Sequence, residues 1–375
     1  MNICFIGHRY SEKITNGVHV STLTLARAIA SLNHNVFLYG VADTNDSFVD
    51  SYGITHRYTT SKRMGSKEMA KIIQEDKDQI DIYCFQSVFI PANFWLSRIV
   101  AKTKKPYVVF PRGGYNANIF KRNRLKKFLY FSLIERIYLY KASGVVCISE
   151  KEIPEVRKIG YKGPVKVTYN PINSYSVTNQ DSYSLKAEKK IIYLGRFDIE
   201  HKGLDILLQL AGEIHKIDPA ISIDLYGNGP DKEKLLTKIR KEKLSYIQVH
   251  DPVYGETKLD TIRSASAYIH TARWEGFGRS VAEAMMLGLP CIVSHTINLA
   301  DEVFKSNQLD LVLGDDIQKN ALDIINFLND KPKLKEVGIR TQTVAQRLFN
   351  STLVAQKTID FLESLVPIQQ TVSAE

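Results

Sequence analysis

The chain has 375 residues, of which 44% are hydrophobic and 24% charged, the balance of a folded globular protein too long for a single core. No run of eighteen apolar residues occurs, which excludes a membrane-spanning helix, and the four cysteines stand alone, which excludes a Cys-x-x-Cys metal or redox site. The N-terminal apolar stretch is too short for a signal peptide, so we expect a cytoplasmic protein.

The net charge of +10 is unevenly placed along the chain. Residues 1–170 hold 26 Lys/Arg and 13 Asp/Glu, whereas the remainder holds 24 basic and 27 acidic residues. The densest basic run, 121–127, is followed by aromatic residues. This pattern has two interpretations: contact with an anionic membrane or a lipid-linked phosphate, or a solvated helix whose other face lies in the core. No recognition motif accompanies the charge, so nucleic acid is not an expected partner.

Short apolar runs alternate with longer amphipathic stretches, which predicts a parallel α/β architecture. In the first half, a buried strand is expected at Ile3–Ile6 and a helix over Val18–Leu32. Further strands of the first half are expected at Val36–Tyr39, Ile80–Phe85, Tyr107–Phe110 and Gly144–Ile148.

Residues 171–190 are polar and rich in Ser and Asn, as a linker would be, and the alternation then restarts. Strands of the second half are expected at Ile191–Leu194, Ile221–Tyr226, Tyr246–His250, Ala267–His270 and Cys291–Ser294. The sequence therefore predicts two doubly wound, Rossmann-like domains, with a ligand cleft between them beyond the carboxyl ends of the strands. Their predicted bounds are 1–170 and 191–343, with a linker at 171–190 and a C-terminal segment at 344–375, helical over 344–365.

The segment from Glu275 to Glu283 places two carboxylates around a Gly-x-Gly turn that leads into a helix. The backbone N–H groups of the turn and the positive end of the helix suit a phosphate, and the carboxylates accept hydrogen bonds from hydroxyl groups. Phosphate and hydroxyls together indicate a nucleotide-sugar. Ser280-x-x-Glu283 is also a capping-box pattern, so a purely structural role for Glu283 stays open.

Two cations follow the strand Ile191–Leu194. Gly195 and Arg196 come directly after it, and Lys202 stands six residues further on, just before a helix that starts near Leu204. A forked guanidinium and a compact ammonium at this position are suited to a diphosphate, although two ordinary surface cations would look the same.

Two glycine turns complete the set of candidates. Gly227-Asn-Gly229-Pro230 again links a strand to a helix, either as a simple tight turn or to let a ligand approach the backbone, and its spacing does not match a dinucleotide-cofactor motif. Gly17 ends a polar loop at a helix start, where its N–H group would face a phosphate or simply cap the helix.

Taken together, these motifs resemble the retaining GT-B-fold glycosyltransferases of family 4, the glycosyl transferases group 1. The first helix is preceded by Asn16-Gly17-Val18, which is similar to the Gly-Gly-Val loop of the family. The segments around Arg196 and Lys202, Gly227 and Glu275-Gly-Phe-Gly follow in the order of the family and at its approximate spacing. The resemblance covers nearly the whole chain.

The resemblance implies a role for each residue of the second half. Arg196, Lys202 and Glu275 would be catalytic: the two cations would stabilise the leaving diphosphate, and Glu275 would hydrogen-bond sugar hydroxyls. Glu283 would hold the ribose. The other donor-binding residues would be Gly195, Gly227, Gly276, Phe277 and Gly278, with the backbone of the last three near the sugar and phosphate.

For the first domain, the resemblance implies acceptor binding, with Gly17 touching the donor diphosphate and the C-terminal helix returning to this domain. Two positions depart from the family pattern. Asn16 replaces the first glycine of the loop, and Arg112-Gly113 stands where many members carry a histidine. Arg112 and Gly113 are therefore expected to line a pocket, either for the acceptor or for the donor.

The implied activity is transfer of a sugar from a nucleotide-sugar to a glycan or lipid-linked acceptor. UDP-sugars are the donors most frequent in the family. The reaction is expected in the cytoplasm, either free or at the inner face of a membrane. No aspartate pair marks a metal site, so we expect no cofactor and cations of the protein in place of a metal. Two alternatives stay open: a nucleotide-sugar epimerase of similar fold, and a non-catalytic subunit that binds a glycan or a protein partner.

Overall fold

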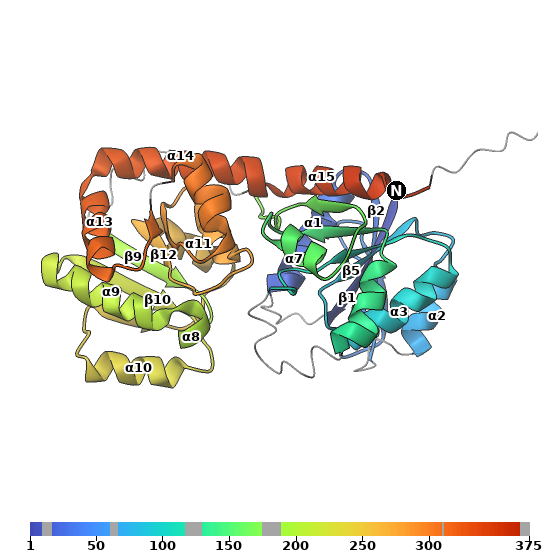
Figure 1. Cartoon of the computed structure of the whole chain (residues 1–375), viewed down its shortest axis with the longest axis horizontal. Helices are drawn as coiled ribbons and strands as arrows, with labels where there is room; N and C mark the ends of the chain where they lie inside the picture. The colour runs from blue at the N-terminus through green and yellow to red at the C-terminus, as the bar shows by residue number, and fades with distance from the viewer. Residues whose placement is uncertain (10–16, 61–66, 117–129, 175–188, 310, 368–375) are drawn as a thin grey trace, which may run out of the picture. The chain divides into compact units, whose positions relative to one another are not determined.

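The computed structural model describes residues 1–9, 17–60, 67–116, 130–174, 189–309 and 311–367 (Figure 1). The chain divides into two compact units. Unit 1 comprises Met1–Asn173 and Ser351–Glu375, and unit 2 comprises Ser174–Asn350. Each unit is built around its own, largely parallel β-sheet.

Unit 1 contains an eight-stranded sheet in the order β3-β4-β2-β1-β5-β6-β7-β8. Every strand pair is parallel except β3 with β4. The strands are β1 (Asn2–Arg9), β2 (Asn35–Val41), β3 (Asp46–Val49), β4 (Thr55–Thr59), β5 (Ile82–Gln86), β6 (Tyr107–Phe110), β7 (Gly144–Cys147) and β8 (Val165–Val167). The helices are α1 (Gly17–Ala30), α2 (Lys67–Glu75), α3 (Pro91–Lys102), η1 (Phe131–Glu135), α6 (Arg136–Tyr140), α7 (Glu152–Lys158) and α15 (Ser351–Glu363).

Both faces of the unit 1 sheet are buried, because successive side chains of a strand point to opposite faces. In β1, Ile3 and Phe5 join the core on the face covered by α1 and α15, whereas Cys4 and Ile6 join the core on the face covered by α2 and α3. Continuous apolar runs in the sequence follow directly from this double burial. The sequence missed β3, β4 and β8 because these strands lie toward the sheet edges and are short or polar.

Unit 2 contains a six-stranded, all-parallel sheet in the order β11-β10-β9-β12-β13-β14. The strands are β9 (Lys189–Leu194), β10 (Ile221–Tyr226), β11 (Ile247–His250), β12 (Ala267–His270), β13 (Cys291–Ser294) and β14 (Val312–Leu313). The helices are α8 (Ile199–Lys202), α9 (Leu204–Ile217), α10 (Lys232–Lys241), α11 (Gly255–Ser264), α12 (Arg279–Met286), η3 (Ala300–Phe304), η4 (Lys305–Asn307), α13 (Ile317–Asn329) and α14 (Lys331–Phe349).

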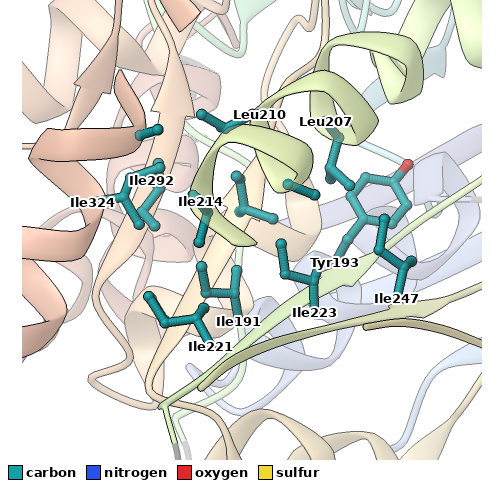
Figure 2. Close-up of a cluster of buried hydrophobic side chains, with 14 of the residues drawn as sticks. Ile191, Tyr193, Leu207, Leu210, Ile214, Ile221, Ile223, Ile247, Ile292 and Ile324 are labelled. Carbon is teal, nitrogen blue, oxygen red and sulfur yellow. The ribbon is translucent and has the colours of Figure 1, made fainter. Parts of the chain in front are cut away.

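The main core of unit 2 lies between its sheet and helix α9. Figure 2 shows Leu207, Leu210 and Ile214 of this helix over Ile191 and Ile223, which come from the neighbouring strands β9 and β10. The apolar residues of α9 recur at helical spacing, so one stripe of the helix meets the sheet while the rest faces outward.

The C-terminal segment differs from the single helix predicted over 344–365. Helix α14 ends at Phe349, Asn350 has an extended ψ of 126°, and α15 begins at Ser351. The N–H of Ser351 donates to the carbonyl of Ile172 at 3.1 Å, a bond outside the helix. Helix α14 therefore belongs to unit 2, and α15 belongs to unit 1, where it packs against α1.

Candidate functional site

The site residues predicted in the second half follow three neighbouring strands. Strands β10, β9 and β12 are adjacent and parallel, so the loops that follow them emerge at one edge of the sheet. The loop after β9 carries Gly195 and Arg196, the loop after β10 carries Gly227, and the loop after β12 carries Glu275. The parallel topology thus brings together residues that are far apart in the chain.

The loops after β9 and β10 are joined through their backbones. The N–H of Gly195 donates to the carbonyl of Tyr226 at 3.0 Å, and a Cβ atom at Gly227 would lie only 1.9 Å from the carbonyl oxygen of Gly195. Only glycine fits at position 227, so this turn supports the neighbouring loop. The side chain of Arg196, carried by that loop, is exposed.

Lys202 is the last residue of the short helix α8, which is held from two sides. Asp198 caps the helix by accepting the N–H of His201 at 3.0 Å. From the loop after β12, the N–H of Arg273 donates to the carbonyl of His201 at 3.0 Å, and its guanidinium donates to both carboxylate oxygens of Asp205, at 2.8 and 2.7 Å. The loop after β12 therefore fixes the position of Lys202.

Lys202 forms an ion pair with Glu275 through Nζ and Oε2, and the two side chains are 14% and 20% exposed. Nε2 of His270 lies 3.5 Å from the same oxygen. Burial alone would raise the pKa of Glu275, but the charge of Lys202 and the contact with His270 outweigh it and hold that pKa far below its usual range. An ionised Glu275 accepts hydrogen bonds only, as expected of a group that binds hydroxyls.

Main-chain groups of residues 276–278 connect Glu275 to helix α12. Gly278 is the N-cap of this helix and has a φ of 72°, a left-handed conformation that favours glycine. The side chain of Phe277 is buried and packs edge to face on Phe349, with ring centroids 5.2 Å apart. Phe277 thus anchors the loop to the interior of unit 2. The N-terminus of α12 offers N–H groups and positive potential to an anion.

Glu283 lies one turn into α12 and is paired with two cations. Oε1 accepts from Nε of Arg279 at 3.0 Å, Oε2 accepts from Nζ of Lys258, and the carboxylate side chain is 8% exposed. The capping-box interpretation of Ser280 and Glu283 is wrong, because the helix begins two residues earlier than an N-cap at Ser280 requires: Gly278 is the N-cap, without a side-chain cap bond. The hydroxyl of Ser280 instead accepts from Tyr268 at 2.8 Å.

The remaining predicted residues belong to unit 1. Gly17 is the first residue of α1. Arg112 has a φ of 56° and donates through Nε and Nη2 to Oε1 of Gln86, at 3.1 and 2.9 Å, and through Nη1 to Oδ1 of Asn170. The N–H of Gly113 donates to the buried carboxylate of Glu152. Arg112 is therefore held at the carboxyl ends of β5 and β6. Asn16 and the basic run 121–127 lie outside the described residues.

Several residues of the site had not been identified from the sequence. Lys258 comes from α11, 25 positions before its partner Glu283, and no sequence signal marks it. Arg279 stands inside the predicted motif, where its four-residue spacing from Glu283 on a helix was a usable signal. His270 ends a predicted strand, so its place at the site edge was also predictable.

The described residues contain no group of three or more His, Cys, Asp and Glu side chains arranged to hold a metal ion. No helix in the same part of the chain is long and apolar enough to cross a membrane. All four cysteines are buried.

Two family models match the chain, one over most of each compact unit. The family described as Glycosyltransferase Family 4 matches residues 15–174, and Glycosyl transferases group 1 matches residues 178–343. The chain belongs to these group 1, family 4 glycosyltransferases. The family inferred from the ordered motifs is confirmed, and the segment Glu275–Glu283 lies inside the second match.

Curated relatives of this glycosyltransferase chain carry glycosyltransferase names. The UDP-N-acetylglucosamine–peptide N-acetylglucosaminyltransferase GtfA subunit of Streptococcus agalactiae is 27% identical over 189 residues, which are 50% of this chain and 34% of that protein. The O-antigen biosynthesis glycosyltransferase WclY of Escherichia coli is 28% identical over 162 residues, 42% of each protein. The matched region thus spans less than half the length of these relatives.

Solved structures show the same fold over nearly the whole chain. Sucrose-phosphate synthase from Thermosynechococcus elongatus superposes with a TM-score of 0.78 at 16% identity, covering 97% of this chain and 98% of that one. Anabaena HepE in complex with UDP-glucose superposes with a TM-score of 0.73 at 16% identity, covering 97% and 100%. The chain therefore has the GT-B fold of this glycosyltransferase family.

Proposed function

We propose that this glycosyltransferase moves a sugar from a UDP-sugar to a glycan or lipid-linked acceptor with retention of configuration. The observation that carries the proposal is the pair of Lys202 and Glu275 at the edge of the unit 2 sheet, beside the N-terminus of α12. A cation, an ionised carboxylate and helix N–H groups in one place suit a ligand with both phosphate and hydroxyls. UDP in the names and titles of relatives supports the choice of base.

In the proposed reaction, negative charge develops on the diphosphate oxygen as the bond to the sugar breaks. Lys202 and Arg196 stabilise this charge, helped by the N-terminus of α12, which is electrostatic catalysis by preorganised groups. Glu275 binds hydroxyls of the transferred sugar, and Glu283 binds the ribose. Since the cations of the protein carry this role, we propose that activity is independent of added metal and survives a chelator.

For the acceptor we propose unit 1, with Arg112 and Gly113 at its carboxyl edge. The side chain of Arg112 is fixed by Gln86 and Asn170 and stacks over the ring of Phe110 at 5.2 Å, so its guanidinium has a defined place from which to meet an acceptor. The net positive charge of residues 1–170 supports an acceptor that carries phosphate.

Contact with an anionic membrane is proposed for the same unit. Leu133, Ile137 and Tyr140 recur at helical spacing over η1 and α6 and are 67%, 44% and 43% exposed. An exposed apolar stripe that follows a basic run in the sequence is suited to an anionic bilayer. We expect Leu133→Ser/Ile137→Ser and Lys126→Glu/Lys127→Glu to reduce co-sedimentation with phosphatidylglycerol vesicles, with Ile339→Ser in unit 2 as the control. Equal sedimentation of all variants, or none of the parent, would reject this contact.

The test of the proposed function starts from binding and proceeds to turnover. A panel of nucleotide-sugars is screened for protection against thermal unfolding, and the best donor is then incubated with candidate acceptors while nucleotide release and glycoside formation are measured. Formation of a glycoside supports the proposal. An isomerised nucleotide-sugar without acceptor would indicate an epimerase, and binding of a glycan without any nucleotide-sugar would indicate a non-catalytic subunit.

A further inference from the structure

His270 is a buried histidine beside the Lys202–Glu275 pair. It is the last residue of β12 and is 1% exposed. Its ring is nearly parallel to those of Tyr193 and Tyr268, with centroids 6.3 and 6.2 Å away. Because the ring is enclosed in the protein interior, packing restricts its rotation and fixes the direction of its two nitrogens.

The two ring nitrogens have different surroundings. Nδ1 lies 3.4 Å from the hydroxyl of Tyr268, and Nε2 lies 3.5 Å from Oε2 of Glu275. Nε2 has no hydrogen-bond partner within bonding geometry among the described residues, although it is fully buried. A lone pair aimed at a carboxylate would be repelled by it, so the tautomer that carries a proton on Nε2 is favoured.

The hydroxyl of Tyr268 lies beside the other ring nitrogen, Nδ1. It lies 2.8 Å from Oγ of Ser280 in α12 and 3.1 Å from the carbonyl oxygen of Leu194 at the end of β9. Its single proton goes to one of these two oxygens, so it makes no short hydrogen bond to Nδ1 at 3.4 Å, and the carboxylate that faces Nε2 decides the tautomer. Burial lowers the pKa of His270, with the nearby charge of Lys202 acting in the same direction, so the ring is neutral and a single N–H is available.

The proposed function makes two demands on Lys202. Its ammonium is the counter-charge of Glu275 in this structure, and the same ammonium is assigned to the donor diphosphate. As Lys202 turns towards a diphosphate, the mostly buried carboxylate of Glu275 loses part of its compensation, which costs free energy unless another donor takes its place. His270 is the neighbouring side chain with a hydrogen-bonding atom already aimed at that oxygen.

We propose that His270 is a positioning residue that holds the carboxylate of Glu275 through Nε2–H while Lys202 engages the donor diphosphate. The inference rests on the proposed function, because it assigns the second partner of Lys202. A small movement that shortens the 3.5 Å separation to an ordinary hydrogen bond is sufficient.

The inference is tested with His270→Leu, which removes the donor, and His270→Gln, which restores an N–H at the end of a side chain of similar reach. His215→Leu is the matched control, since His215 stacks on Tyr246 at the far end of α9. We expect His270→Leu to lower kcat roughly tenfold or more with a smaller change in donor KM, and His270→Gln to recover most of kcat. An unaltered kcat in His270→Leu, or equal losses in both variants, would overturn the inference.

A second measurement is made on the parent protein and needs no turnover. In protein labelled with ¹⁵N-histidine, the ring nitrogens of His270 report its tautomer, with the signal assigned from its absence in His270→Gln. We expect a neutral ring protonated at Nε2. A ring protonated at Nδ1 would overturn the inference even if the enzyme is active. Absence of sugar transfer by the parent protein would instead overturn the proposed function, and the two failures are thus distinguished.

Discussion

Lys202 and Glu275 form an ion pair although 73 positions separate them in the chain. One comes from α8 after strand β9, and the other comes from the loop after strand β12. They meet because these two strands are adjacent and parallel, so that their carboxyl ends lie at one edge of the sheet. Stability and proposed activity therefore depend on the same contact.

Removing either charge of this pair is expected to affect both properties. Lys202→Met and Glu275→Gln each leave a mostly buried group without its partner, and we expect a loss on the order of 2 kcal/mol in the free energy of unfolding, measured with urea. The double variant should lose less than the sum of the two single variants. Nucleotide release should fall about 100-fold or more in all three.

Lys189→Met is the control for this series, because Lys189 pairs with Asp218 at 2.7 Å at the opposite end of β9. It should leave nucleotide release unchanged. Additive losses of stability in the Lys202–Glu275 cycle, or full activity in either single variant, would contradict the assignment.

Glu283 is expected to recognise the ribose of the donor. If it does, 2′-deoxy-UDP should bind the parent protein more weakly than UDP. The difference in affinity should vanish in Glu283→Gln, because the contact between the hydroxyl and the carboxylate is already absent from that variant. Lys258→Met should weaken UDP binding less than Glu283→Gln does, since Arg279 still holds the carboxylate. Isothermal calorimetry measures all five affinities. A deoxy effect that persists in Glu283→Gln would exclude this role.

The close approach of two site loops predicts a severe effect of a single methyl group. A Cβ at position 227 would lie 1.9 Å from the carbonyl oxygen of Gly195, whereas a Cβ at Gly314 would meet no atom within 4 Å. We expect Gly227→Ala to destabilise unit 2 by about 2 kcal/mol or more, and Gly314→Ala to change its stability by less than about 0.5 kcal/mol. Thermal unfolding of the two variants compares them directly, and equal midpoints would refute the predicted clash.

Glu152 is expected to make the stability of unit 1 depend on pH. Burial raises the pKa of Glu152 to about 7, above the ordinary value of 4.5. Between these two values the folded protein keeps a proton that the unfolded chain has released, so this carboxyl makes stability fall as pH rises from about 4.5 to about 7. The full effect of one such group is on the order of 3 kcal/mol.

Glu152→Gln should remove this share of the pH dependence, although it also loses one of the bonds to the N–H groups of Gly113 and Ile148. Glu135, whose pKa burial also raises to about 7, remains and limits the change. Urea unfolding at pH 5 and pH 7.5 gives, for each protein, the difference in the free energy of unfolding between the two pH values. Equal differences in the parent and in Glu152→Gln would contradict the prediction.

The interior of the fold was predictable because parallel strands buried on both faces appear in the sequence as continuous apolar runs. Strands β6, β10, β12 and β13 have the bounds predicted from such runs. The same signal is absent from β4, Thr55–Thr59, where polar residues lie toward the sheet edge, and from the two-residue strand β14. The break at Asn350 was also missed, because the bond from Ser351 to Ile172 joins residues that lie far apart in the chain.

By itself, the sequence determined the class of the protein and the residue types of its site. Glycines at fixed turns, cations after a strand and two carboxylates around a Gly-x-Gly turn are local features, and each can be read within a few residues. Only the tertiary structure decided which groups act as partners. The pairs of Lys202 with Glu275 and of Lys258 with Glu283 depend on the order of strands in a sheet, which no local pattern encodes.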